Sequence, residues 1–163
     1  MSTWNKGAAR AVADVTKGIV LASVEIEASP ERVFYALTQE EDITRWWGSD
    51  DQYRMIGYQA DLRAGGAWRV EGRMPEGRTF VTDGEILEIE PARKLVQTWN
   101  LRWNRVSTVA YLLEPTDGGT RLTVRHEGFG EDVPLCRMHE TDWETALGWL
   151  VRYLTSVSAC VAP

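Results

Sequence analysis

The sequence predicts an α+β fold, in which a curved antiparallel β-sheet wraps around one long C-terminal α-helix. Three features predict this fold class: an amphipathic segment near the end of the chain, a series of alternating apolar and polar segments before it, and glycine-rich turns between those segments. Alternation with a period of two is typical of strands that bury one face. Tight turns between successive strands give antiparallel pairing.

The long helix is predicted over residues 141–157. Large apolar residues recur there at intervals of three or four, a spacing that places them on one face of a helix. Thr141 or Asp142 is expected to cap the first turn, because a short oxygen-bearing side chain can accept a free backbone N–H. One helix cannot bury so apolar a face alone, so the preceding sheet must cover it. The residues of this face are Trp143, Leu147, Leu150, Leu154 and Val157.

The N-terminal residues 1–17 are polar and contain several alanines, and we treat them as an extension of a domain that spans residues 18–163. A short helix is expected over residues 8–15, although a helix of this length is not stable in isolation. The extension is expected to pack on the domain or on a second copy of the chain. A homodimer is therefore one of the arrangements that the sequence allows.

The domain is expected to open with a strand over residues 18–28, followed by two short helices. Ser29 is the N-cap candidate of the first helix, and Pro30 suits the first helical position because it lacks a backbone N–H. This helix is expected to end near Leu37, and the second is expected over residues 40–47.

Six further strands are predicted between these helices and the C-terminal helix. Turns that contain glycine or proline separate them, which is the usual chemistry of tight turns. In most of them the side chains alternate between an apolar and a polar face, whereas the first is broken by Gly57 and the third is expected to bend at Gly84. The strands are expected over residues 53–62, 68–73, 79–90 and 94–103, around Tyr111, and around Val124.

The composition is that of one globular domain. A chain of 163 residues is long enough to bury a core without metal ions or disulfides. A net charge of −6 argues against nucleic acid and anionic membranes as partners, because both need clustered Lys and Arg. No apolar run is long enough to span a bilayer, and residues 1–20 lack the pattern of a signal peptide. With Cys136 and Cys160 as free thiols, we expect a soluble cytoplasmic protein.

A ligand cavity is predicted between the inner face of the sheet and the long helix. Eight tryptophans are more than an ordinary core needs, and a cavity lined by aromatic side chains with a few polar groups is typical of small-molecule sites. Trp46 and Trp47 are expected to cover the entrance, with the alternative that Trp47 only anchors the second helix. A close-packed core requires the same alternation, so both interpretations stay open. The predicted lining is Trp47, Trp68, Val70, Trp99, Leu101, Tyr111, Leu113, His126, Trp143, Leu147 and Leu150.

His126 is the most informative titratable residue of this predicted lining. Its ordinary pKa of about 6.5 allows it to exchange a proton near neutral pH, so it can act on a ligand carbonyl. The alternative, which we favour, is a hydrogen-bonded structural histidine. The segment from Cys136 to His139 has the spacing of a metal-binding pair, but a structural zinc needs four ligands and no second pair exists. We expect this segment to be a mobile loop before the helix.

Several short motifs occur in an order that matches one protein superfamily. They lie at residues 28–34, 46–48, 61–68, 84–91, 94–99, 113–124 and 126–129. Together they resemble the SRPBCC superfamily, also called START-like or Bet v 1-like, and within it the C-terminal domain of the Hsp90 ATPase activator Aha1. The resemblance covers residues 18–154. It implies a helix-grip fold with a cavity between sheet and helix, and it implies no single activity, because members include lipid carriers, polyketide cyclases, hormone receptors and chaperone cofactors.

The leading functional hypothesis is a binding protein for a small hydrophobic or aromatic molecule, with Tyr111 and His126 orienting the ligand. An enzyme of the cyclase, aromatase or hydrolase type, using His126 or Tyr111 as acid or base, is the alternative. A co-chaperone of an Hsp90-type ATPase is disfavoured, because residues 1–17 cannot replace the separate client-binding region of the activator. No catalytic residue, metal ligand or cofactor is predicted.

Overall fold

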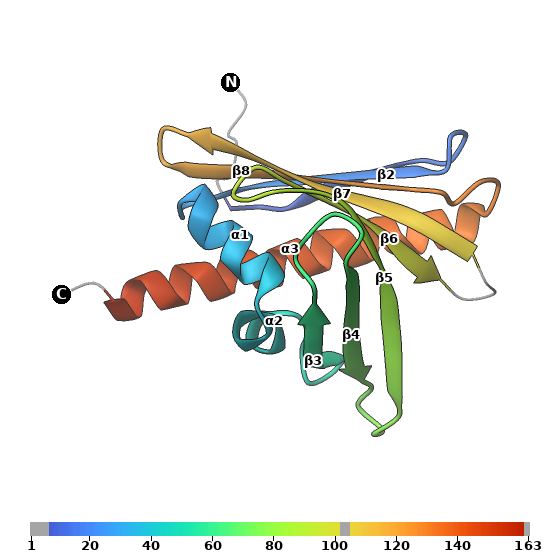
Figure 1. The fold of residues 1–163 in the computed structure, drawn as a ribbon, viewed down its shortest axis with the longest axis horizontal. Coiled ribbons are helices and arrows are strands. Elements are labelled where there is room, and N and C mark those ends of the chain that lie inside the picture. Colours follow the sequence, from blue (N-terminus) through green and yellow to red (C-terminus); the bar gives the residue numbers. More distant parts are fainter. Residues whose placement is uncertain (1–6, 102–104, 162–163) are drawn as a thin grey trace.

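One eight-stranded antiparallel sheet and three helices make up the fold, in an α+β arrangement (Figure 1). The computed structural model describes residues 7–101 and 105–161, and the side chains of residues 157–161 lie outside this description. The elements are β1 (Arg10–Asp14), β2 (Ile19–Ile26), α1 (Pro30–Thr38), α2 (Glu40–Trp46), β3 (Arg54–Ala60), β4 (Ala67–Arg73), β5 (Thr79–Glu90), β6 (Lys94–Leu101), β7 (Arg105–Thr116), β8 (Gly119–Glu127) and α3 (Val133–Val161).

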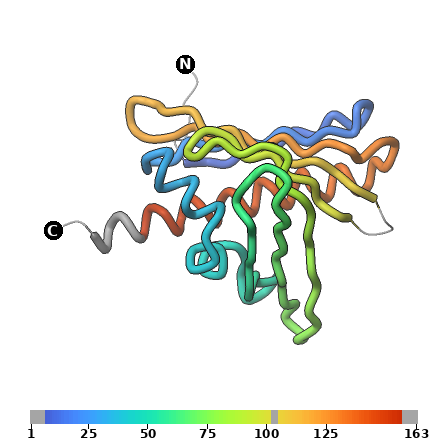
Figure 2. The backbone as a smooth tube through the Cα atoms, in the orientation of Figure 1, coloured from blue at the N-terminus to red at the C-terminus, as the bar shows by residue number. Residues whose placement is uncertain are grey.

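The sheet follows the strand order β1-β2-β8-β7-β6-β5-β4-β3, so the strand that precedes the helices pairs with the last strand of the chain. Figure 1 shows α3 running along one face of this sheet, while the end formed by β3, β4 and β5 turns past the helix. The tube in Figure 2 shows how the chain crosses from β2 through α1 and α2 to that end. The predicted fold class, a curved sheet around a C-terminal helix, is confirmed.

The predicted alternation of side chains is found in β2, β4, β6, β7 and β8, whereas a bulge interrupts it in β3. In β6, for example, Leu95, Gln97 and Trp99 are buried, whereas their neighbours are more exposed. The sheet bends at β5, where the pairing with β6 shifts register between Ile86 and Glu88. Gly84 is required beside this bend, because a Cβ there would lie 1.8 Å from the Thr98 carbonyl oxygen. The predicted strand over residues 94–103 corresponds to β6, and its last expected residue, Trp103, lies outside the described residues.

The long helix begins at Val133, not near residue 141, and this corrects two expectations. The segment from Cys136 to His139 is helical and is not a loop, and Thr141 and Asp142 are interior residues rather than caps. The cap is Asp132, whose Oδ1 accepts a hydrogen bond from Leu135 N at 3.1 Å. The predicted apolar face is confirmed for the members whose side chains are described, Trp143, Leu147, Leu150 and Leu154, all of which are buried.

Residues 10–14 form strand β1 and not the short helix that was predicted over residues 8–15. The strand pairs with the free edge of β2, which satisfies backbone groups that a solvent-exposed two-turn helix would leave to water. Two carboxylates of α3 complete this arrangement. Ala11 N donates to Glu144 at 3.1 Å, and Ala13 N donates to Glu140 at 2.5 Å.

Helices α1 and α2 are held by capping and by one buried charge. Ser29 accepts a hydrogen bond from Arg32 N at 3.2 Å, which confirms the predicted N-cap. Asp42 on α2 is almost fully buried and accepts Arg32 Nη1 at 2.7 Å and the Tyr153 hydroxyl of α3. Because a buried carboxylate needs such partners, this group joins the two short helices to the long one.

Candidate functional site

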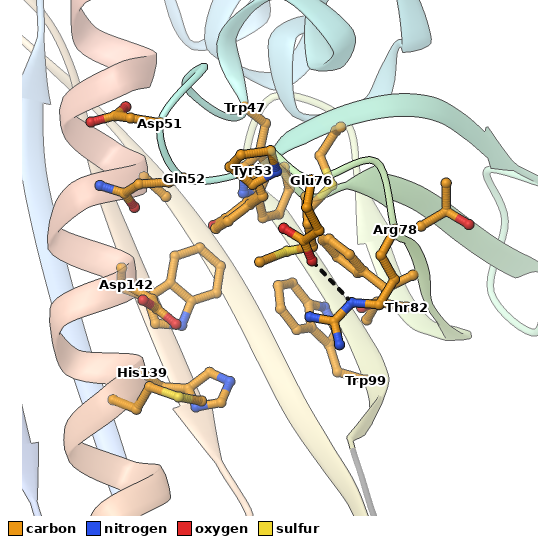
Figure 3. Close-up of a pocket in the computed structure, with 18 residues that line it drawn as sticks. Trp47, Asp51, Gln52, Tyr53, Glu76, Arg78, Thr82, Trp99, His139 and Asp142 are labelled. Carbon is orange, nitrogen blue, oxygen red and sulfur yellow. Dashed lines mark ion pairs between the residues drawn. The ribbon is translucent and has the colours of Figure 1, made fainter.

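A pocket of about 900 Å³ lies between α3 and the end of the sheet that turns past it. Its walls come from the loop after α2 with Met55 of β3, the turn between β4 and β5 with the start of β5, Trp99 of β6, and the first half of α3. Figure 3 shows side chains from these segments pointing toward a common space. We call this space the aromatic pocket, after the five Trp, Tyr and Phe residues that line it: Trp47, Tyr53, Phe80, Trp99 and Trp143.

Three tryptophans form the inner wall of the aromatic pocket. The ring centroids of Trp47 and Trp99 lie 6.0 Å apart, those of Trp99 and Trp143 lie 5.4 Å apart, and those of Trp47 and Trp143 lie 6.3 Å apart. All three pairs are tilted, so none of the three rings stacks flat on another. Such a wall offers a large, rigid apolar surface together with indole N–H donors.

The rim of the aromatic pocket is polar and carries more acidic than basic groups. Glu76 and Arg78, on the turn between β4 and β5, form an ion pair at 3.4 Å (Figure 3). Burial raises the pKa of Asp142 above its ordinary value, against a smaller opposite influence of His139. Burial also raises the pKa of Tyr53 to about 12, so this phenol stays protonated at neutral pH. The other polar residues of the lining are Asp51, Gln52, Thr79, Thr82 and His139.

The indole N–H groups of the buried tryptophans fall into two sets. Three are satisfied by the protein: Trp46 Nε1 donates to Ala36 O at 2.8 Å, Trp68 Nε1 to Thr98 O at 2.9 Å, and Trp143 Nε1 to His126 Nδ1 at 3.0 Å. Trp47 Nε1 and Trp99 Nε1 have no hydrogen-bond partner among the described residues, although Trp47 lies close to the Tyr53 hydroxyl. These two side chains are only 8% and 9% exposed, and both line the aromatic pocket.

His126 lies in the core next to the aromatic pocket and is completely buried. An indole N–H can only donate, so Trp143 Nε1 fixes His126 Nδ1 as an acceptor. The proton of the neutral ring is therefore on Nε2, which donates to Ser107 Oγ at 2.7 Å. Burial lowers the pKa of His126 well below its ordinary value. We call His126, Ser107 and Trp143 the histidine cluster. Both ring nitrogens are engaged within the protein, as expected of the structural histidine that we favoured.

Some of the predicted lining residues border the aromatic pocket, and the others lie in the core or at the end of β6. Trp47, Trp99 and Trp143 border the pocket. Leu101 is half-buried at the end of β6. The other predicted residues are buried in the core outside the pocket: Trp68, Val70, Tyr111, Leu113, His126, Leu147 and Leu150. Tyr111 is an example, since burial raises the pKa of its phenol well above the ordinary value.

Sequence reasoning missed much of the pocket wall, notably Tyr53, Phe80, His139 and Asp142. A signal for two of them was present. His139, Asp142 and Ala146 are spaced by three and four residues, so they share one face of a helix that begins before residue 139. Starting the helix near residue 141 hid this face. Within the described residues, no group of three or more His, Cys, Asp and Glu side chains is placed to hold a metal ion.

A single long helix gripped by a curved sheet, with a pocket between them, defines the helix-grip class of α+β proteins. The sequence model of the Activator of Hsp90 ATPase homolog 1-like protein family matches residues 27–155. The chain belongs to this family, which confirms the resemblance found in the motifs. No helix among the described residues is long and apolar enough to cross a membrane.

Solved structures share the fold along most of their length. A Rhodobacter sphaeroides protein has a TM-score of 0.79 and 22% identity, with 91% of this chain and 99% of that chain covered. For a Nitrosomonas europaea protein the TM-score is 0.74 and the identity 23%, with coverage of 88% and 97%. The AHSA1-like protein from Aeromonas hydrophila has a TM-score of 0.68 and 20% identity, with coverage of 86% and 94%. No curated protein matches the chain.

Proposed function

We propose that this protein binds a small aromatic molecule in the aromatic pocket, and that the ligand carries a hydrogen-bond acceptor such as a carbonyl oxygen. One observation carries the proposal. Among the described residues, Trp99 Nε1 has no hydrogen-bond partner and Trp47 Nε1 has only the nearby Tyr53 hydroxyl beside it, and both are buried donors of the pocket wall. A buried donor without an acceptor costs about 1–3 kcal/mol, so a ligand that supplies the acceptor recovers this free energy.

The size and chemistry of the pocket support the same proposal. A volume of about 900 Å³ suits a molecule of two or three fused rings. Burying roughly 250 Å² of apolar ligand surface contributes about 6 kcal/mol, before the cost of association is subtracted. With one or two hydrogen bonds to the indole donors, the expected dissociation constant is on the order of micromolar.

The enzyme alternative, with His126 or Tyr111 as acid or base, is less well supported. Both ring nitrogens of His126 are bonded within the histidine cluster, and Tyr111 is buried outside the pocket. Neither side chain lines the aromatic pocket, where a ligand could exchange a proton with it. A binding role needs neither residue to meet the ligand.

The test uses Prodan, a neutral naphthyl ketone whose emission reports binding. We expect saturable binding to the unmodified protein with a micromolar dissociation constant. Trp47→Phe and Trp99→Phe each remove one donor and keep a ring, so each should weaken binding by about fivefold, the value of one net hydrogen bond. Trp149→Phe is the matched control, because Trp149 lies on α3 outside the pocket lining and phenylalanine keeps a ring against Tyr53.

A second probe separates ring burial from donor recognition. Dimethylaminonaphthalene has the ring system and amine of Prodan but lacks the ketone. It should bind more weakly than Prodan and with the same affinity to all four proteins. The absence of saturable Prodan binding would refute the proposed function. Equal affinity of the two probes, unchanged by Trp47→Phe and Trp99→Phe, would refute the role of the indole donors.

A further inference from the structure

Asp142 is a carboxylate in the wall of the aromatic pocket. It lies on α3, is half-buried, and points toward the pocket beside His139 (Figure 3). Among the residues that the structure describes, no side chain or backbone group forms a hydrogen bond or an ion pair with it. Its electrostatic neighbours are His139 and the Tyr53 hydroxyl. A partly desolvated carboxylate without a partner is costly, and a cation that entered the pocket would relieve this cost.

Apart from His139, the lining that the structure describes offers no unpaired basic side chain to compete for that role. The charged side chains of the lining are Asp51, Glu76, Asp142 and Arg78. Arg78, the single arginine among them, is already paired with Glu76 at 3.4 Å. The local potential is therefore negative, and it favours the entry of a cation over that of an anion.

The inner wall of the pocket also suits a cation. The negative faces of tryptophan rings attract an ammonium group that lies within about 6 Å of a ring centroid. Trp47, Trp99 and Trp143 pack against one another with ring centroids 5.4–6.3 Å apart, so a group that lies against this wall is near more than one ring. The unpartnered indole donors, more than nine-tenths buried, point independently to a ligand in the same space.

We infer that the aromatic pocket selects an amine-bearing aromatic molecule, whose ammonium group pairs with the Asp142 carboxylate while an acceptor elsewhere on the ligand meets the indole donors. This inference rests on the proposed function and narrows it to one charge class. An anionic ligand would have to displace Glu76 from Arg78 and approach Asp142 and Asp51 against their charge.

The experiment compares three probes with one ring system and different charge: naphthylmethylammonium, naphthylmethanol and naphthoate. Calorimetric titration should give the tightest binding for the ammonium, about fivefold weaker binding for the alcohol, and the weakest binding for the carboxylate. A partly buried ion pair of about 1 kcal/mol corresponds to this factor. Raising the salt concentration should weaken binding of the ammonium and leave the alcohol unaffected.

Asp142→Asn identifies the carboxylate that is responsible. It should lower the affinity for the ammonium to that for the alcohol and leave the affinity for the alcohol unchanged. Glu131→Gln is the matched control, because it removes the same charge just before α3, outside the pocket lining. This control should leave the preference for the ammonium intact.

The outcomes separate the two proposals. Equal affinity for ammonium and alcohol, or a preference that survives Asp142→Asn, overturns the charge inference while the pocket keeps its function. Tightest binding of naphthoate overturns it as well and assigns the site to an anion. If none of the three probes nor Prodan binds, the proposed function itself fails, and the inference fails with it.

Discussion

The histidine cluster and the aromatic pocket are adjacent and share Trp143 of α3. They differ in whether their polar groups have hydrogen-bond partners within the protein. In the histidine cluster, Trp143 Nε1, both nitrogens of His126 and the Ser107 hydroxyl have partners within the protein. In the aromatic pocket, two indole donors and the Asp142 carboxylate have none among the described residues. The difference teaches that the fold satisfies the polar groups of the closed histidine cluster, whereas two buried indole donors that face the pocket lack a partner among the described residues. A third such buried group, Gln97 Oε1, lies on β6 outside the pocket lining.

Replacing His126 by leucine should give the largest effect, because the histidine cluster stabilises the closed region. His126→Leu replaces the imidazole with an apolar side chain of similar size, and it leaves Trp143 Nε1 without an acceptor and Ser107 Oγ without its donor. We expect a loss of about 2–4 kcal/mol in the free energy of unfolding, measured by urea denaturation. The affinity for Prodan should change little while the protein is folded. A loss below about 1 kcal/mol would contradict the structural role of His126.

A matched pair of tryptophan variants compares the two regions directly. Trp143→Phe and Trp99→Phe remove the same ring atoms, but only Trp143 donates to a protein acceptor. Trp143→Phe leaves His126 Nδ1 unpaired, so we expect it to cost about 1–3 kcal/mol more than Trp99→Phe in urea denaturation. For Prodan binding we expect the opposite order: Trp99→Phe should weaken binding more than Trp143→Phe, because Trp99 supplies a donor to the ligand. Equal costs in stability would remove the distinction between the two regions.

The pH dependence of stability should also report the histidine cluster. The folded protein keeps His126 neutral because burial lowers its pKa, whereas the unfolded chain takes up a proton near the ordinary pKa of 6.5. The stabilisation from neutral His126 is therefore complete above about pH 6.5 and is lost as the pH falls toward the folded pKa. The slope is about 1.4 kcal/mol per pH unit in that window. The same titration of His126→Leu should lack this component, and an unchanged slope would contradict the account.

The smallest effect is expected at Asp142, and it should be a gain in stability. Burial raises the pKa of this carboxyl in the folded protein, so folding is disfavoured once the pH rises above the unfolded value of 3.8 and the group must ionise inside the pocket wall. Asp142→Asn should thus stabilise the ligand-free protein near neutral pH, by less than about 1 kcal/mol because solvent still screens the exposed part of the carboxylate. Thermal unfolding measures this change, and destabilisation would indicate that Asp142 has a partner in the protein.

The fold was predictable because half-buried strands and a helix with one buried face impose strict periods. Alternation in β6 placed Leu95, Gln97 and Trp99 correctly on the inner face. The start of α3 was also readable, since Asp132 before Val133 and Pro134 is a typical N-cap, but the expected cap at Thr141 obscured it. Strand β1 was not readable, because the alanines of residues 10–14 favour no strand until the edge of β2 is available.

The candidate site was predictable only in part, and the reason is geometric. Alternation tells which side chains face α3, but not which of them α3 touches. That depends on the bend of the sheet at β5 and on the turn between β4 and β5, which holds Glu76 and Arg78 at the rim. Trp99 and Trp68 are both on the inner face, yet only Trp99 borders the pocket. Long-range packing, which no local pattern encodes, separates these two tryptophans.

The most direct test of the central claim is the indole region of a proton–nitrogen correlation spectrum, recorded while Prodan is added. Trp→Phe variants assign each indole signal. A hydrogen bond from an indole to the ketone should move the proton signals of Trp47 and Trp99 downfield, while those of Trp46 and Trp68, already bonded to backbone carbonyls, stay in place. Dimethylaminonaphthalene should produce no such downfield shift. Saturable Prodan binding that leaves the Trp47 and Trp99 signals unshifted would contradict the claim that these two indoles donate hydrogen bonds to a bound ligand.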